Sequence, residues 1–296
     1  SHFFKGYIPD RLIFYALPSP KAENLWWFLF PAVVFIFFLR YRTRMERLPF
    51  WQFVFFLWCV FSVFSLSVAG IREGFFSMYE PFTRSYWEYA GNLSFVESIP
   101  AFLTDFTRLL PQLAIHSITH PPGYTMILFL FSRYLHAGIP GLAVLVVLLG
   151  GASLCPVACF FRKFLTDRDV RRALQLFIFL PGVVLFSAAS MEIALVFFTW
   201  LAITAIFSGW QKNSAWSFLG GLAVGLALFQ NFLFLLLAPF FLFLAVFVFR
   251  SSPIERRTAV LWRVAASTLG FLAFYYFLYA TTGYSIIENF FMSRQL

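Results

Sequence analysis

Long apolar runs separated by short polar segments dominate the pattern of this chain. The runs are continuous rather than alternating, which favours membrane-spanning helices over the strands of a barrel. A helix needs about 20 apolar residues to cross the hydrocarbon core. The candidate spans are 24–40, 50–71, 122–137, 140–162, 171–188, 189–209, 215–230, 231–250 and 259–281. The pattern predicts an all-α, polytopic helical membrane protein with about eight or nine transmembrane helices, because the regions 171–209 and 215–250 can be divided differently at Pro181-Gly182 and Gln230-Asn231.

The basic segment RYRTRMER (40–47) indicates the orientation of the first spans. The positive-inside rule places it in the cytoplasm, so the span 50–71 crosses outward and residues 72–121 form a long external loop. The chain then divides into an N-terminal interfacial segment (1–23), two N-terminal spans (24–71), the external loop (72–121) and a helical bundle (122–296). Because the chain stops at SRQL without a capped or tail-like ending, we expect the native protein to continue.

One conflict in this topology stays open at the level of sequence. If 122–137 crosses the membrane completely, the basic clusters at 162–172 and 250–257 fall outside, against the same positive-inside rule. Either the segment after residue 121 is not a full span, or other forces determine the orientation.

Composition supports the membrane assignment. The chain is 61% hydrophobic and 12% charged, whereas soluble domains are about half apolar and a quarter charged. Most of the net charge of +9 lies in short loops, where topology and anionic lipid account for it. No nucleic-acid motif is found, so we expect membrane lipids and no nucleic acid as partners.

The external loop gathers most of the candidate chemistry. It holds five of the 13 acidic residues, together with several aromatic residues and two histidines; the acidic residues are Glu73, Glu80, Glu88, Glu97 and Asp105. Loops of this length in a compact protein are usually functional or disordered, and the aromatic content argues against disorder. Helical spacing of apolar residues predicts an interfacial helix over 100–115.

The stretch YEPFTRSYWEYAGN (79–92) interleaves Glu80 and Glu88 with aromatic residues and Arg84. Aromatic faces such as those of Trp87 and Tyr89 stack on sugars, and a carboxylate can take a proton from an attacking hydroxyl. Arg84 is suited to hold a phosphate. The simpler interpretation is an amphipathic interface segment that contains a Glu–Arg pair.

The stretch HSITHPPG places His116 and His120 four residues apart. Two histidines at this spacing on a helix can bind a metal, but the following Pro121-Pro122 disfavours regular helix through His120. The pattern favours His120 as a hydrogen-bond donor to a phosphate at the start of a helix, where anions are attracted. A divalent ion beside that phosphate stays open, as does the simpler interpretation that HPPG only begins a helix.

Three further features lie within the apolar segments. Glu192, near a span end, is a functional candidate because ionisable groups are costly in the membrane, unless it lies just outside the hydrocarbon. Gln230 and Asn231 are candidates for interhelical hydrogen bonds, and Gly220, Gly221 and Gly225 form a small-residue face typical of helix packing. No P-loop, dinucleotide fingerprint, HExxH or GxSxG is present.

Several features follow one another in a recognisable order between residues 50 and 250. An outward span precedes YEPFTRSYWEYAGN, and THPPGYTMILFLFSRYLHAGIPG then leads into a helix and a Gly-containing turn. A span ending in FFRKFL, a segment broken at Pro-Gly and the glycine-rich GGLAVGLALFQNFLFLLLAPF come next. HPPG alone is too short to be specific, but the ordered set resembles the GT-C-fold glycosyltransferases of the protein O-mannosyltransferase and aminoarabinose transferase type.

The resemblance implies an enzyme of a bacterial inner membrane that transfers a sugar from a polyprenyl-phosphate carrier to an acceptor on the outer face, usually with inversion of the anomeric centre. Glu80 or Glu88 matches the loop carboxylate of the family, and His120 matches the histidine of its HPP motif. Trp87, Tyr89, His116 and Glu192 complete the substrate-binding candidates, while Arg84 as a phosphate ligand is inferred from its chemistry rather than from the resemblance.

The chain also departs from the family pattern. The family often has adjacent Asp-Glu, or an aspartate soon after the aromatic stretch, where this chain has Asn92. Asparagine cannot act as a base, so the role passes to Glu88 or Asp105. A non-catalytic subunit of the same fold within a larger membrane complex is therefore an alternative. A transporter would show internal repeats, which we do not find, and a pigment-binding subunit would need histidines inside the spans.

Overall fold

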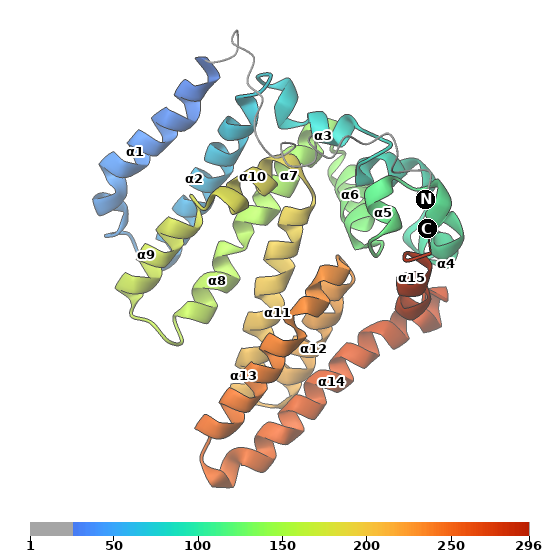
Figure 1. Cartoon of the computed structure of the whole chain (residues 1–296). Helices are drawn as coiled ribbons and strands as arrows, with labels where there is room; N and C mark the ends of the chain where they lie inside the picture. The colour runs from blue at the N-terminus through green and yellow to red at the C-terminus, as the bar shows by residue number, and fades with distance from the viewer. Residues whose placement is uncertain (1–25, 296) are drawn as a thin grey trace.

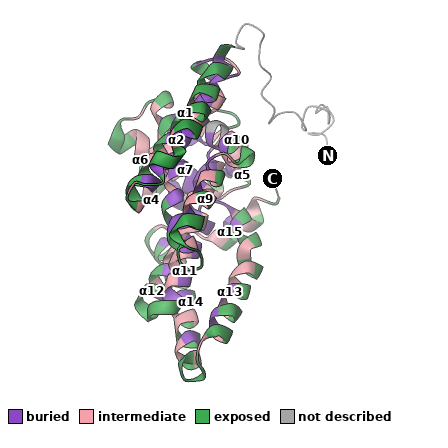
Figure 2. Cartoon of the chain, turned by 90° about the vertical axis from the view of Figure 1, so that its left-hand side faces the viewer, coloured by how far each residue is buried: buried purple, intermediate pink, exposed green. Residues whose placement is uncertain are grey.

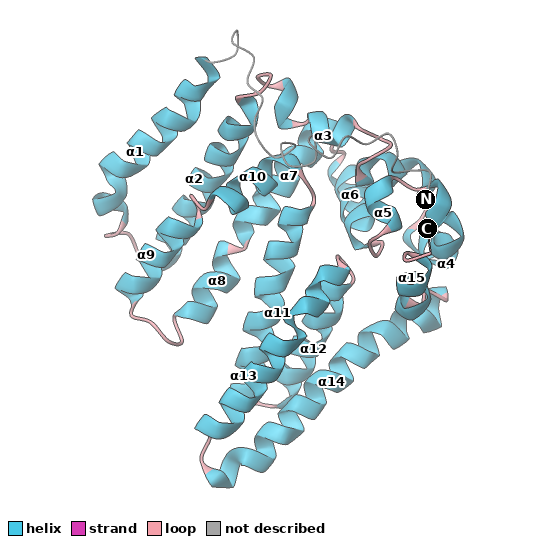
Figure 3. Cartoon of the chain, viewed as in Figure 1, coloured by secondary structure: helices cyan, strands magenta, loops and turns pink. Residues whose placement is uncertain are grey.

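The structure is a computed structural model that describes residues 26–295. Within this range every regular element is a helix, and no strand is present (Figure 3). The prediction of an all-α polytopic protein is therefore confirmed. The predicted N-terminal interfacial segment lies outside the described residues.

The helices follow the chain in three groups (Figure 1). The N-terminal pair is α1 (Leu29–Met45) and α2 (Phe50–Gly70). The region that was predicted as an external loop contains η3 (Phe76–Met78), α3 (Glu80–Thr83), η4 (Tyr89–Phe95), α4 (Ile99–Leu109), η5 (Leu110–Gln112) and α5 (Ile115–Ile118). The remainder consists of α6 (Gly123–Leu135), α7 (Ile139–Ala152), α8 (Leu154–Phe161), α9 (Asp167–Phe177), α10 (Pro181–Ala189), α11 (Glu192–Lys212), α12 (Ser214–Leu228), η6 (Phe232–Leu237), α13 (Ala238–Ser251), α14 (Ile254–Thr282) and α15 (Ile286–Met292).

Six helical segments among residues 26–295 are long and apolar enough to cross a membrane: Trp26–Met45, Phe50–Gly70, Ile139–Phe161, Glu192–Lys212, Phe232–Ser251 and Ile254–Thr282. A seventh candidate is the pair Asp167–Phe177 and Pro181–Ser187, which is bent by 56°. The bend lies at Pro181, as predicted from the Pro-Gly break, because proline ends the preceding helix. The apolar helix α12 is shorter than these spans.

The segment 122–137 is not one of these candidates. Its helix, α6, has 13 residues and is about 20 Å long at 1.5 Å per residue, which is too short to cross the hydrocarbon core. The helix ends where His136 adopts a left-handed conformation with φ of 52°, a common way to terminate a helix. The structure thus favours the first of the two topological alternatives, in which this segment is not a full span.

Contacts between distant segments define the two ends of the bundle. At one end, Arg171 donates to the Leu48 carbonyl at 3.0 Å and Lys163 lies 3.2 Å from Gln211. At the other end, the Gly123 amide donates to the Phe229 carbonyl at 3.1 Å.

With α6 not crossing, the basic clusters 40–47, 162–172 and 250–257 all lie at the first end (Figure 1). The conflict with the positive-inside rule disappears, and we expect this end to face the cytoplasm. The loop that contains the candidate chemistry then lies at the outer end.

Burial separates central from peripheral helices (Figure 2). In the most apolar 18-residue stretch of Ile139–Phe161, 61% of the residues are buried, whereas in that of Ile254–Thr282 only 11% are buried. Helix α14 exposes large apolar side chains along its length, including Leu261, Trp262, Leu269, Leu272, Tyr276 and Phe277. Such a surface is suited to lipid, so α7 and α8 form the centre of the bundle and α14 its periphery.

The small-residue face predicted on α12 packs closely against its neighbours. A Cβ atom on Gly221 would lie 1.9 Å from the Ser267 carbonyl oxygen, and one on Gly270 would lie 2.1 Å from that of Phe218. Glycines permit this approach of α12 and α14. The packing interpretation of this face is therefore confirmed.

Candidate functional site

The external loop is folded against the bundle through Asn92, which is completely buried. Its Nδ2 donates to Ser117 and, at 3.1 Å, to Thr125, while its Oδ1 accepts from the Ala114 amide at 2.8 Å. The side chain of Asn92 thus joins η4 to the region of α5 and α6. Asn92 has a structural role here, and its amide orients the chain on both sides of the candidate site.

Gly123 of the HPPG motif is a second fixed point. Its amide bonds to the Phe229 carbonyl, and a Cβ atom there would lie 2.3 Å from that oxygen. The glycine is required because the start of α6 approaches the backbone after α12 so closely. HPPG therefore begins a helix and locks it against the bundle, while His120 and Tyr124 lie next to this contact.

Three elements distant in sequence bring Glu88, His116 and Glu192 together. His116 Nδ1 lies 3.7 Å from Glu88 Oε2 and 4.0 Å from Glu192 Oε1. Glu192 is the first residue of α11, where a carboxylate is favourable near the helix N-terminus. It also accepts a hydrogen bond from the Ser190 hydroxyl. We call Glu88, His116 and Glu192 the carboxylate–histidine cluster.

Electrostatics single out Glu88 within this cluster. Burial is the main cause that raises the pKa of Glu88 from 4.5 to about 8, and the charge of Glu192 raises it further. Arg84 acts in the opposite direction and lowers it. A carboxyl group with such a pKa can exchange a proton near neutral pH, as a general acid or base must.

Tyr89 and Tyr124 are completely buried beside the cluster, with ring centroids 5.0 Å apart. Burial and the charge of Glu192 raise the pKa of Tyr89 well above its usual value, so it stays a hydroxyl donor. The hydroxyl of Tyr89 interacts with Glu192, and that of Tyr124 interacts with the side chain of Asn231. The two rings therefore connect η4 and the start of α6 to the first residue of α11 and to the chain after α12.

His120 lies near the same two rings, with its centroid 6.1 Å from that of Tyr89 and 6.4 Å from that of Tyr124. Its Nδ1 lies 2.8 Å from the Thr119 hydroxyl. Burial lowers the pKa of His120. The ring is therefore neutral at physiological pH and can donate a hydrogen bond, but it supplies no positive charge for a phosphate.

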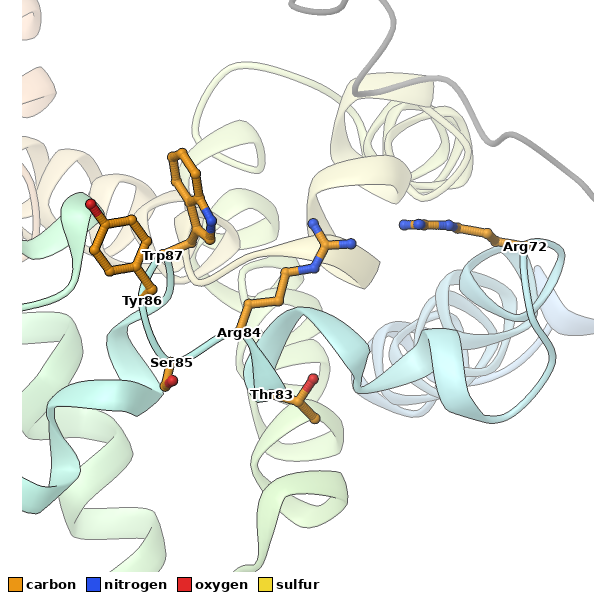
Figure 4. Close-up of a pocket in the computed structure, with 6 residues that line it drawn as sticks. All are labelled: Arg72, Thr83, Arg84, Ser85, Tyr86 and Trp87. Atoms are coloured by element: carbon orange, nitrogen blue, oxygen red, sulfur yellow. The ribbon is translucent and has the colours of Figure 1, made fainter. Parts of the chain in front are cut away.

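Two arginines line a neighbouring pocket of about 460 Å³ (Figure 4). The pocket is lined by Arg72, Thr83, Arg84, Ser85, Tyr86 and Trp87. The guanidinium groups of Arg72 and Arg84 point toward each other across it (Figure 4). The carboxyl group of Glu80 bonds to both, at 3.3 Å to Arg72 Nη1 and 2.8 Å to Arg84 Nε. We call these three residues the arginine–glutamate bridge.

Asp105, the third predicted catalytic carboxylate, lies elsewhere. It belongs to α4, which confirms the predicted helix as far as Leu109, and forms a 2.9 Å ion pair with Arg108 on the exposed side. The buried side of α4, which includes Phe106, packs against Tyr284. Asp105 takes part in neither the cluster nor the bridge, because the helical period turns it away from the buried face of α4.

Two contributors were missed at the level of sequence. Arg72 follows a span and was counted only as one of the few basic residues of the loop, and Tyr124 was treated as the start of an apolar helix. The excess of acidic residues around Arg72 was the available signal. Among residues 26–295, no group of three or more His, Cys, Asp or Glu side chains has an arrangement that could hold a metal ion.

Comparisons with protein-family models, curated proteins and solved structures give no match to this chain. The geometry of the site is therefore the basis on which its function is inferred.

Proposed function

We propose that this chain is a membrane glycosyltransferase that moves a sugar from a polyprenyl-phosphate carrier to an acceptor at the outer face of a bacterial inner membrane. The observation that carries the proposal is the position of Glu88. Its carboxyl group is largely buried beside His116 and Glu192. Arg84 interacts electrostatically with Glu88 and also lines the pocket that contains Arg72.

In the proposed reaction, the ionised Glu88 carboxylate takes the proton of an acceptor hydroxyl. The acceptor oxygen forms a bond to the anomeric carbon of the sugar as the bond from that carbon to the phosphate oxygen breaks. The electron pair of the broken bond leaves with polyprenyl phosphate, whose charge Arg72 and Arg84 would stabilise. Attack from the side opposite the phosphate inverts the anomeric centre.

The other candidates have supporting roles in this scheme. His116 contacts both carboxylates of the cluster and would orient Glu88. Trp87 lines the pocket and offers a ring face on which a sugar can stack. His120 would supply a neutral donor for a sugar hydroxyl, and Tyr89 and Tyr124 pack next to its ring. Glu80 is less suited than Glu88 to act as a base, because two guanidinium groups already bind its carboxylate.

The test measures donor cleavage by the purified full chain in proteoliposomes. The donors are polyprenyl-phosphate mannose and polyprenyl-phosphate aminoarabinose, and the readout is release of polyprenyl phosphate in the presence of a membrane extract as acceptor source. Glu88→Gln removes the base and is expected to lower the rate by about 10²- to 10⁴-fold. Glu97→Gln is the matched control, since it removes the same charge from an exposed position of the same loop.

Equal release by wild type and Glu88→Gln, at equal yield and thermal midpoint, would contradict the proposal. Absence of cleavage of either donor by the wild type would favour the alternative of a non-catalytic subunit in a larger membrane complex.

A further inference from the structure

The arginine–glutamate bridge has a geometry that bears on how an anion enters the pocket. Glu80 Oε1 accepts from both Nε and Nη2 of Arg84, and Glu80 Oε2 accepts from Arg72 Nη1. The side chain of Glu80 is only 14% exposed, whereas those of Arg72 and Arg84 are 43% and 35% exposed. The carboxylate therefore lies beneath the two guanidinium groups, and these groups face the opening of the pocket.

The contacts of Arg84 mean that a phosphate can bind this guanidinium group only by replacing the Glu80 carboxylate. A guanidinium group binds carboxylate and phosphate through the same bidentate arrangement of parallel N–H donors. The Nε and Nη2 edge of Arg84 is already engaged by one oxygen of Glu80. A phosphate can use that edge only if the carboxylate releases it.

The net charge of the arginine–glutamate bridge favours replacement of the Glu80 carboxylate by a phosphate. Two guanidinium groups and one carboxylate leave a net charge of +1, so the bridge still attracts an anion. A phosphate group carries more oxygen acceptors and more negative charge than a carboxylate. The pocket also includes Thr83, whose hydroxyl donates to the Glu80 carbonyl at 2.7 Å and so fixes the short helix α3 that carries Glu80.

We propose that Glu80 is a built-in competitor for this anion site, and that the phosphate group of the ligand binds by displacing the Glu80 carboxylate from Arg72 and Arg84. The carboxylate keeps both guanidinium groups converging on the pocket, which reduces the ordering cost when phosphate binds. The same carboxylate competes for the arginines when the phosphate leaves. The identification of the phosphate as that of a lipid carrier rests on the proposed function, whereas the exchange itself does not.

The experiment measures binding by the full chain in nanodiscs, separately for inorganic phosphate and for radiolabelled polyprenyl phosphate. Glu80→Gln keeps an acceptor oxygen but removes the competing charge, and is expected to tighten binding by about 3- to 10-fold. Arg84→Gln removes the main guanidinium and is expected to weaken binding by about tenfold or more, the effect of losing a charge-assisted hydrogen bond. Glu97→Gln, the matched control, should leave the dissociation constants unchanged.

The outcomes separate the sources of phosphate. Tighter binding of polyprenyl phosphate by Glu80→Gln supports the exchange and assigns the site to a lipid-linked ligand. Tighter binding of inorganic phosphate alone supports the exchange and assigns the site to a free phosphate. Unchanged or weaker binding of both probes overturns the exchange, because Glu80 would then only support the arginines.

A second variant, Glu80→Asp, tests the exchange in case Glu80→Gln misfolds. Glu80→Asp keeps the charge but shortens the reach to the two arginines, so it should tighten phosphate binding in the same direction by a smaller factor. If phosphate binding follows these expectations while Glu88→Gln cleaves donor as fast as the wild type, the exchange stands and the proposed transferase fails. If donor cleavage needs Glu88 but both Glu80 variants bind phosphate like the wild type, the proposed transferase stands and the exchange fails.

Discussion

Glu88 and Glu192 approach the same imidazole nitrogen, Nδ1 of His116, at 3.7 and 4.0 Å, although one carboxylate belongs to the external loop and the other begins a transmembrane helix. This relationship couples the two acids electrostatically. The charge of Glu192 raises the pKa of Glu88, after the larger effect of burial. The pair therefore provides one carboxyl group that can exchange a proton near neutral pH and a second that supplies negative charge beside it.

Donor cleavage should depend on pH through Glu88. The base is the ionised form and the pKa of Glu88 is raised to about 8, so the rate should rise with pH and level off above about pH 8. Glu192→Gln removes the second cause of the shift, and the rising limb should move to lower pH while staying above pH 4.5, since burial still raises the pKa. A pH–rate profile for both proteins tests this, and identical limbs would show that Glu88 and Glu192 are not coupled.

Stability should change with pH in the opposite sense. The folded-state pKa of Glu88 is about 8 and the ordinary value is 4.5, so the folded state binds more protons between these values. Its contribution to the free energy of unfolding is complete below about pH 4.5 and is lost as pH rises through about 8.

Between these limits, the wild type should lose up to about 1.4 kcal/mol per pH unit relative to Glu88→Gln. Thermal midpoints of the two proteins in detergent at pH 6 and pH 8.5 provide the measurement. Parallel changes of both midpoints would rule out this linkage.

Asn92 should be important for folding of the loop. Asn92→Ala removes hydrogen bonds to Ser117 and Thr125 and leaves the Ala114 amide unpaired. The expected loss is about 1–3 kcal/mol for a buried group without a partner. Ser94→Ala, at an exposed position of the same loop, serves as the control. Chemical-denaturant unfolding of both variants measures the difference, and equal stability would contradict the structural role of Asn92.

The contact at Gly123 predicts a cost for a single methyl group. Gly123→Ala would place Cβ 2.3 Å from the backbone oxygen of Phe229, which must move, at a cost of about 1–3 kcal/mol. Gly182→Ala adds the same group where nothing lies within 4 Å, and it should be neutral. A lowered thermal midpoint is expected only for the first variant. Equal midpoints would mean that the start of α6 is not locked against the chain after α12.

The topology predicts which positions a membrane-impermeant maleimide reaches from outside the cell. In a background with Cys59, Cys155 and Cys159 replaced by serine, Ser94→Cys should be labelled in intact cells. Arg168→Cys and Glu255→Cys should be labelled only after permeabilisation, because their basic loops lie at the opposite end of the bundle. Labelling of either from outside would indicate that α6 crosses the membrane after all.

The apolar pattern alone determined much of the architecture. Continuous apolar runs identify helices, because a helix in lipid must satisfy its own backbone hydrogen bonds and bury its length in hydrocarbon. They predicted eight or nine spans, whereas six segments of residues 26–295, or seven with the bent pair, are long enough to cross, because α6 and α12 are shorter helices. The break at Pro181, the helix that carries Asp105 and the small residues at Gly221 are local features as well. Each depends on residues within a few positions, so the sequence predicts it.

The arrangement of the site was decided by tertiary structure. Glu88, Glu192 and His116 meet only because the loop folds back through Asn92 and α11 begins beside it. The pairing of Arg72 with Glu80 likewise depends on how the chain turns after α2. Hydropathy and spacing do not predict such contacts, because the contacts arise from the packing of helices that are distant in sequence. That packing also determined that α6 is a short helix held at the outer end, because Gly123 meets Phe229 there.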